Sequence, residues 1–264
     1  MNLLAARSLM QRELVRFFRQ RSRVLSAFLT PLVFWLLFGL GFGKSFHPPG
    51  TPEDVGPLEF FFPGTLLMIV LFTAIFATIS VIEDRREGFL QSVLVAPVGR
   101  SGIVLGKMLG GTLLSLAQVL PLLVVAPLAG LHLGVVGFLV ATATLTIVAF
   151  GLTGLGFLIA WRLDSTQSFH AIMNLFLMPM WMLSGAVFPA SGAPGWLRAV
   201  MALNPMTYAL AALRRGLEFE APAPRFAAGT PGLAISLLVS IIFAALTFAL
   251  AAQQSRRTST GDLH

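Results

Sequence analysis

The 264-residue sequence has few charged residues and no cysteine. Asp, Glu, Lys and Arg make up 11% of the chain, 56% of the residues are hydrophobic, and the mean hydropathy is +0.84. A soluble domain carries about 25% charged residues, so this composition is typical of an integral membrane protein. The absence of cysteine excludes disulfides, thiolate metal sites and cysteine nucleophiles.

Several kinds of chemical site are also missing. The apolar runs carry no ionisable residue near their centres, although ion-coupled transporters and intramembrane enzymes depend on such residues. Gly102 and Gly106 do not begin a P-loop, because three residues instead of four separate them and Met108 follows the lysine. The histidines lack metal-ligand spacing; they are His47, His132, His170 and His264. The sequence therefore predicts a chain that is not an enzyme and binds no cofactor or metal itself.

Six apolar runs are long enough to cross a bilayer, which takes about 20 residues. They are Val24–Phe42, Phe60–Ile82, Met108–Ala129, Val135–Trp161, Phe169–Phe188 and Pro231–Ala252. Each run must be helical, because lipid offers no partners to backbone polar groups. We expect an all-α integral membrane fold, with a six-span domain over residues 24–252 and a cytoplasmic tail over residues 253–264.

The basic residues indicate how the spans are oriented. With the N-terminus inside, 13 of the 18 Lys and Arg fall in internal segments and 5 in external ones, as the positive-inside rule requires. Both termini are thus predicted to be cytoplasmic. The net charge of +7 then reflects internal loops that face anionic lipid, and we expect no nucleic-acid partner. The first run is too long for a cleaved signal peptide, so it is expected to stay as an anchor.

Residues 1–23 have the pattern of an amphipathic cytoplasmic helix. Apolar residues recur at steps of three and four, and arginines recur on the opposite face; they are Leu3, Ala6, Met10, Leu14, Phe17 and Phe18, and Arg12, Arg16, Arg19 and Arg23. We expect this helix to lie along the inner membrane surface. It would serve either as a topology anchor or as a mechanical part.

Small and polar residues inside the runs predict how the helices pack. Gln118 and Asn174 are strongly polar groups at membrane depth, where each would hydrogen-bond a neighbouring helix or line a translocation cavity. Glycines repeat around the start of the third run and within the fourth run, and they predict close helix contacts; they are Gly106, Gly110, Gly151, Gly154 and Gly156.

The first internal loop, residues 83–107, begins with charges and continues with an apolar stripe. Phe89, Leu90, Val93 and Leu94 share one face of a short helix that Pro97 ends. A loop that only joins two spans does not need an apolar face. The stripe either rests on lipid or inserts into a cytoplasmic partner.

The external segment, residues 189–230, begins with turn residues and continues with an apolar stretch that is too broken to span. We expect interfacial or re-entrant helices here, with Trp196 and Tyr208 at the depth of the lipid headgroups. The basic side chains would meet lipid phosphates or pair with Glu218 and Glu220; these side chains are Arg198, Arg214 and Arg215.

These two segments resemble the integral membrane permeases of ABC-2 type exporters, including the drug-, lipooligosaccharide- and polysaccharide-exporting members. In that family the internal loop has an acidic residue, Gly-Thr, a Leu-rich turn and an Ala-Pro-Val-like break. Here the match is at Glu87-Gly88, Leu90, Leu94 and Ala96-Pro97-Val98, with Phe89 where Thr is usual. The second signature matches at Ser184, Gly185, Asn204, Pro205, Tyr208 and Arg214.

The resemblance covers nearly the whole chain and implies a half-transporter in a prokaryotic inner membrane. It implies a second permease subunit, more often an identical one, and a separate ATP-binding subunit that holds ATP and Mg. It also implies that the internal loop is a coupling helix on that subunit; the coupling residues would be Glu83, Arg86, Glu87, Gly88, Phe89, Leu90, Val93, Leu94 and Pro97.

The predicted function is therefore export of an amphipathic or lipid-like substrate, such as a drug, a lipid or a lipid-linked glycan. A chain with no nucleotide site and no ion-coupling charge needs free energy from a partner. The alternative is a membrane scaffold that docks a cytoplasmic partner without transporting anything.

Overall fold

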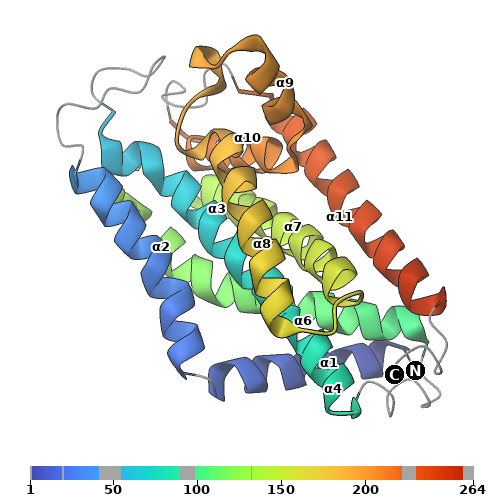
Figure 1. Ribbon diagram of the computed structural model, residues 1–264. Coiled ribbons are helices and arrows are strands. Elements are labelled where there is room, and N and C mark those ends of the chain that lie inside the picture. Colours follow the sequence, from blue (N-terminus) through green and yellow to red (C-terminus); the bar gives the residue numbers. More distant parts are fainter. Residues whose placement is uncertain are drawn as a thin grey trace.

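The computed structural model describes residues 2–19, 21–41, 55–89, 99–131, 133–221 and 230–257, and every regular element in these ranges is helical (Figure 1). The α-helices are α1 (Asn2–Arg19), α2 (Arg21–Gly41), α3 (Pro57–Ala77), α4 (Ile79–Arg86), α6 (Arg100–Val124), α7 (Val135–Ala160), α8 (Thr166–Trp181), α9 (Gly195–Leu203), α10 (Pro205–Leu217) and α11 (Leu233–Arg257). Shorter turns of helix are η2 (Ala126–Ala129), η3 (Met182–Ala186) and η4 (Ala190–Gly192).

Five helical stretches in the described residues are long and apolar enough to cross a membrane. They are Pro57–Arg86, Arg100–Val124, Val135–Ala160, Thr166–Ala186 and Leu233–Arg256, and they coincide with five of the predicted runs. The first predicted run falls in α2, where the apolar stretch is the shorter Leu29–Gly41. The all-helical fold is confirmed for the described residues, and a sixth crossing stays a prediction.

Two helices extend beyond the apolar runs that predicted them. α6 begins at Arg100 instead of Met108, and α11 continues past Ala252 to Arg257. The predicted ends were set at polar or charged residues, which are costly in lipid, but the helical backbone does not have to stop there. As a result Lys107 lies inside α6, with its residue surface only 5% exposed.

α3 lies at the centre of the bundle, where it packs against α2, α6, α7 and α8 (Figure 1). Most of its side chains are buried. Two tryptophans join neighbouring helices to its backbone: Trp35 Nε1 of α2 donates to the Leu58 carbonyl, and Trp181 Nε1 of α8 donates to the Gly64 carbonyl, both at 2.8 Å. Large exposed apolar side chains lie on the outer faces of α2, α8 and α11, as expected for surfaces that face lipid or another subunit.

The predicted close packing at glycines is confirmed. A Cβ atom on Gly106 would lie 2.8 Å from the backbone oxygen of Ala6 in α1. One on Gly154 would lie 2.7 Å from Thr247 Oγ1 in α11. A side chain at either position would force the helices apart.

The buried face of α1 differs from the predicted apolar face. Ala6, Leu9, Glu13 and Phe17 are buried, whereas Met10 and Leu14 are only partly so. This face packs against α6. The prediction is confirmed for Ala6 and Phe17, and the side chains of Leu3 and Phe18 lie outside the described ones. Glu13 was missed because hydrophobic periodicity does not count an acidic residue that is buried against a cation of another helix.

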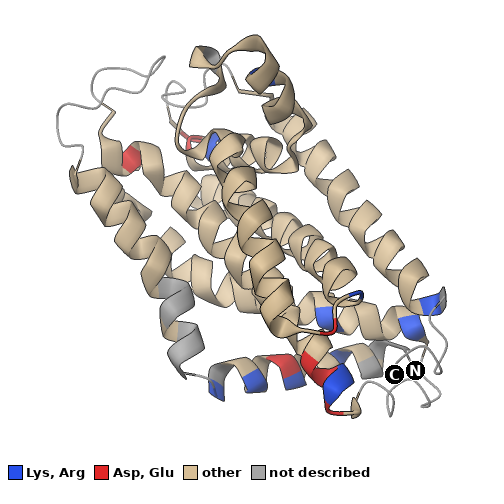
Figure 2. Ribbon diagram, viewed as in Figure 1, with Lys and Arg blue, Asp and Glu red and all other residues tan. Residues whose placement is uncertain are grey.

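Charged residues gather at one end of the molecule (Figure 2). This charged end consists of α1, residues 79–89, the start of α6, the turn 161–164 between α7 and α8, and the last turn of α11. The opposite end holds α9 and α10 (Figure 1).

The predicted external segment forms two helices at that opposite end. Asn204 separates them: its Oδ1 accepts a hydrogen bond from Met206 N at 3.0 Å, and Pro205 takes the first helical position, where its missing N–H costs nothing. α10 packs against α7 and α11. Trp196 is 70% exposed, and Tyr208 donates its hydroxyl hydrogen to the Ala202 carbonyl. A re-entrant path through lipid stays a prediction.

Candidate functional site

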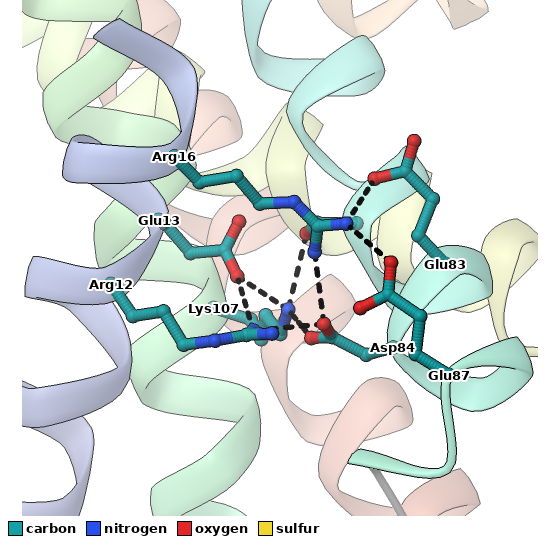
Figure 3. Close-up of polar contacts among 8 residues, drawn as sticks. Arg12, Glu13, Arg16, Glu83, Asp84, Glu87 and Lys107 are labelled. Carbon is teal, nitrogen blue, oxygen red and sulfur yellow. Dashed lines mark hydrogen bonds and ion pairs between the residues drawn. The ribbon is translucent and has the colours of Figure 1, made fainter. Parts of the chain in front are cut away.

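A buried ion cluster joins α1, α4 and α6 at the charged end (Figure 3). Lys107 Nζ of α6 contacts the carboxylates of Asp84 and Glu13, and donates a hydrogen bond to Ser80 Oγ at 3.1 Å. All four residues are buried, and Asp84 is 0% exposed. Lys107 thus connects α6 to both of the other helices.

Two arginines of α1 extend the cluster to the end of α4. Arg12 Nη1 and Arg16 Nη1 contact the same oxygen of Asp84, at 2.8 and 3.0 Å. Arg16 Nη2 also reaches Glu83 at 3.0 Å and Glu87 at 3.1 Å. The arginine face of α1 therefore binds α4, and at these two positions it does not lie free on the membrane surface.

The charges within this cluster nearly balance. It has three cations and four carboxylates, and buried charge of either sign is costly unless it is paired. Burial lowers the pKa of the Arg16 guanidinium, but the nearby carboxylates, Glu83, Asp84, Glu87 and Glu13, outweigh this and raise the pKa above its ordinary value. Arg16 is therefore always charged, and the cluster is a fixed structural joint.

The joint lies at the beginning of the 83–107 segment and includes part of the predicted coupling set. Glu83 and Glu87 bind Arg16, as above. Gly88 has a φ of +72°, which ends the helical stretch, and the Phe89 ring lies 3.8 Å from the Arg12 guanidinium carbon. Arg86 points to another neighbour, and its Nε donates to the Asp164 carbonyl at 2.9 Å. The remaining predicted coupling residues lie outside the described residues; they are Leu90, Val93, Leu94 and Pro97.

Although the last residue of this segment, Lys107, belongs to the joint, the start of α6 is held by a different helix, α11. Arg100 Nη1, at the start of α6, donates to the carbonyls of Ser255 and Arg256, each at 2.9 Å. These are carbonyls of the last turn of α11, which have no partner within that helix. Both ends of the 83–107 segment are thus fixed to the helical bundle.

A cavity of about 490 Å³ lies among α1, α2, α3 and α8. Its wall is largely apolar, with four phenylalanines and a few polar groups; it includes Phe17, Thr30, Phe34, Phe72, Thr73, Phe76, His170 and Asn174. Thr30, His170 and Asn174 are exposed, so the cavity opens at the surface of the single subunit. Gln118 does not line the cavity, but its Oε1 accepts a hydrogen bond from Oγ1 of the wall residue Thr73 at 2.9 Å, which links α6 to α3.

The residues of the second signature meet at the opposite end. η3 closes α8 with a left-handed Gly185, whose φ is +93°. Arg214 Nη2 of α10 donates to the Gly185 carbonyl at 3.0 Å, and its guanidinium lies 4.9 Å from the centre of the Phe60 ring. Asn204 Nδ2 donates to the Met180 carbonyl at 2.7 Å. Ser184 is buried, and its hydroxyl donates to the Trp181 carbonyl.

Arg214 is held inside the protein and not at a lipid headgroup. It is 3% exposed. Burial lowers its pKa to about 10, and the Glu218 carboxylate opposes this shift, so the side chain is charged at neutral pH. Arg215 is also bound internally, with Nε and Nη2 donating to the carbonyls of Pro231 and Thr230. Binding to lipid phosphates, one of the two predicted roles, does not apply to the buried Arg214, and for the half-buried Arg215 it stays a prediction.

Sequence reasoning missed the central residues of the ion cluster. The hydrophobic pattern of residues 1–23 assigns no role to Glu13, and Lys107 is predicted only as the residue that precedes the third run. The sequence did contain a sign that Glu13 is buried, because it lies on the same helix face as Ala6, Leu9 and Phe17. Lys107 directly follows Gly106, where α6 contacts α1 closely. Within the described residues, no group of acidic and histidine side chains is arranged to hold a metal ion.

Comparison with known proteins identifies the family. The family described as ABC-2 type transporter matches residues 5–217, which is most of the chain and includes both the ion cluster and the second signature. The chain belongs to the ABC-2 type transporter family.

Individual members of the ABC-2 family are similar at a moderate level. The chain is 28% identical over 208 residues to the putative transport permease ycf38 of Cyanophora paradoxa, which covers 78% of this chain and 71% of that protein. It is 26% identical over 198 residues to the daunorubicin resistance ABC transporter permease protein DrrB1 of Streptomyces coeruleorubidus, covering 70% and 65%. It is 26% identical over 216 residues to nodulation protein J of Sinorhizobium fredii, covering 81% and 79%.

Membership of the ABC-2 family confirms three of the expectations. The chain is a multi-pass permease subunit of an ABC transporter. It is not itself catalytic, and the ATPase is in a partner, because ABC permeases pair with ATP-binding subunits.

Proposed function

We propose that this ABC-2 permease, together with a second permease subunit, forms the export path for an amphipathic or lipid-like substrate. A separate ATP-binding subunit docks on the 83–107 segment. One observation carries the proposal: the stretch Pro57–Arg86 both lines the cavity, through α3, and enters the ion cluster and the docking segment, through α4. A partner that moves the docking segment would therefore also move a helix that lines the cavity where a substrate would bind.

The composition of the cavity supports the choice of substrate class. Four phenylalanines supply apolar surface and aromatic faces, and the described wall contains no Asp, Glu, Lys or Arg. Such a surface binds flat or extended apolar bodies, and the hydroxyl and amide groups at the rim suit a polar head. Phe17 of α1 lines the cavity at the charged end, so the substrate would approach from the inner leaflet.

The mechanism follows from the rigidity of the joint. When two ATP-binding subunits close on ATP, they displace the docking segment, and the buried ion cluster makes α1, α4 and α6 move with it. The spans tilt as rigid bodies, and the cavity changes between an inward and an outward form. The ATP-binding subunits supply the differential binding energy that shifts this equilibrium.

The proposed orientation can be checked with introduced cysteines, because the chain has none of its own. Arg162 and Gly192 are exposed, at the charged and the opposite end respectively. In intact cells a membrane-impermeant maleimide is expected to label Gly192→Cys and to label Arg162→Cys only after the membrane is opened. The reverse pattern would place the charged end outside and would contradict the proposed docking side.

Transport is tested with the permease and its ATP-binding subunit reconstituted in proteoliposomes. The probes are daunorubicin and a fluorescent phospholipid, and both are expected to move in an ATP-dependent way. Asn174→Trp places a large ring at the cavity rim and is expected to slow transport about tenfold. Gln167→Trp, on an exposed position of the same helix that does not line the cavity, is the matched control. A complex that hydrolyses ATP but moves neither probe would instead support the scaffold alternative.

A further inference from the structure

We propose that Arg85 and Arg86 form a second transmission contact, which carries motion of α4 to the turn between α7 and α8 and from there to the cavity. The proposal rests on the proposed function, because it assumes that the segment after α4 is where the ATP-binding subunit acts. It assigns to the 161–164 turn a role that is separate from the ion cluster with α1.

The contact consists of several hydrogen bonds from α4 to one short turn. Arg85 Nη2 donates to the Trp161 carbonyl, and Nη1 donates to Asp164 Oδ1 at 3.0 Å and to the Leu163 carbonyl at 3.5 Å. Arg86 Nε donates to the Asp164 carbonyl at 2.9 Å. The Arg85 side chain is 12% exposed, whereas the Asp164 side chain is 92% exposed. The backbone carbonyls are therefore the partners that hold the buried guanidinium.

These acceptors are at the C-terminal end of α7. Carbonyls there have no intrahelical partner and carry the negative end of the helix dipole, so a cation next to them is stabilising. The Trp161 ring lies 5.8 Å from the Arg85 guanidinium carbon and stacks on Phe157 with ring centres 5.1 Å apart. Phe157 is a buried core residue. A shift of α4 must then move the end of α7 or break this set of contacts.

The turn leads directly into a helix that lines the cavity. Ser165 caps α8, with its Oγ accepting from Ser168 N at 3.4 Å. One turn further on, the His170 ring packs against Phe76 with ring centres 4.9 Å apart and planes tilted by 38°, and both side chains line the cavity. A displacement of the turn would therefore change the distance between α8 and α3 at the cavity wall.

The two contacts of α4 lie on different faces of that helix. Glu83, Asp84 and Glu87 bind α1, whereas Arg85 and Arg86 bind the 161–164 turn. Successive residues of a helix point about 100° apart, so the acidic pair Glu83-Asp84 and the basic pair Arg85-Arg86 point to different sides and direct α4 to two neighbours at once. α4 thus distributes one movement to both sides of the cavity: α1 and α2 on one side, and α8 on the other.

The test separates ATP hydrolysis from transport in the reconstituted complex. Arg85→Met is expected to co-purify with the ATP-binding subunit and to keep its ATPase rate within about twofold, while transport of daunorubicin falls about tenfold. More ATP is then consumed per molecule moved. Arg85→Lys is expected to be intermediate, because one ammonium cannot bind both ends of the turn. Arg162→Met, on the same turn but exposed, is the control that should leave the ratio unchanged.

A second readout does not depend on transport. Spin labels on Leu29→Cys in α2 and Gln167→Cys in α8, both exposed, report the width of the cavity mouth. ATP and vanadate are expected to change this distance in the otherwise unaltered chain and to leave it unchanged with Arg85→Met. If neither probe is transported but the distance still responds through Arg85, the proposed function fails and the transmission contact stands. A response in Arg85→Met equal to that of the unaltered chain, or none in either, overturns the transmission contact.

Discussion

Replacement of Asp84 by asparagine is expected to lower the thermal midpoint of the detergent-solubilised protein by roughly 10 °C. Asp84 is fully buried and is shared by Arg12, Arg16 and Lys107. Asparagine keeps the shape of the side chain but removes the negative charge, so three cations lose their common partner. Breaking a buried ion pair from one side costs about 3–5 kcal/mol, and each kcal/mol lowers the midpoint of a chain of this size by about 2–4 °C.

The control for Asp84→Asn is Glu87→Gln, which removes a carboxylate from the same cluster. The Glu87 side chain is 57% exposed, and a surface ion pair contributes only about 0–1 kcal/mol, so its midpoint should stay within a few degrees of the unaltered chain. The double variant Asp84→Asn with Lys107→Met removes one cation together with the anion, and it should be more stable than the sum of the single effects predicts. Equal midpoints for Asp84→Asn and Glu87→Gln would show that the cluster does not hold α1 to α4.

The arrangement of the long helices could be predicted from the sequence because lipid imposes one simple condition. A backbone in hydrocarbon must be helical, so the length of an apolar run defines its helix. Five runs correspond to five long helices for this reason. Glycine spacing predicted close contacts by the same kind of local argument, since Gly106 has no side chain to keep α1 away.

The ion cluster and the cavity could not be predicted in this way, because both depend on contacts between distant parts of the chain. Glu13, Asp84 and Lys107 come from three helices, and each alone reads as the polar end of a segment. A charge that is expensive in isolation becomes acceptable once opposite charges surround it. The cavity likewise depends on α2 and α8 lying on either side of α3, which no local pattern encodes.

Replacement of Arg214 by methionine is expected to loosen the opposite end of the molecule and to lower the midpoint by roughly 5–10 °C. Methionine fills similar apolar space but cannot donate to the Gly185 carbonyl or neutralise nearby Glu218. A buried acceptor that loses its donor costs about 1–3 kcal/mol, and more when charge is involved. The contact with the Phe60 ring contributes further, because a cation over an aromatic face is favourable, by roughly 0.5–2 kcal/mol.

Hydrogen exchange locates the effect of Arg214→Met on the structure. Gly185 has a left-handed backbone inside η3, a conformation that its surroundings must hold in place. Amides of residues 182–187 are therefore expected to exchange at least about tenfold faster in the variant, because local opening no longer has to break the Arg214 contact. Arg198→Met, an exposed position on α9, should alter neither the midpoint nor the exchange. If Arg214→Met lowers the midpoint while exchange in η3 stays as slow as before, Arg214 stabilises α10 alone. The end of α8 would then be fixed by Asn204 and Trp181, whose hydrogen bonds to Met180 and Gly64 do not involve the arginine.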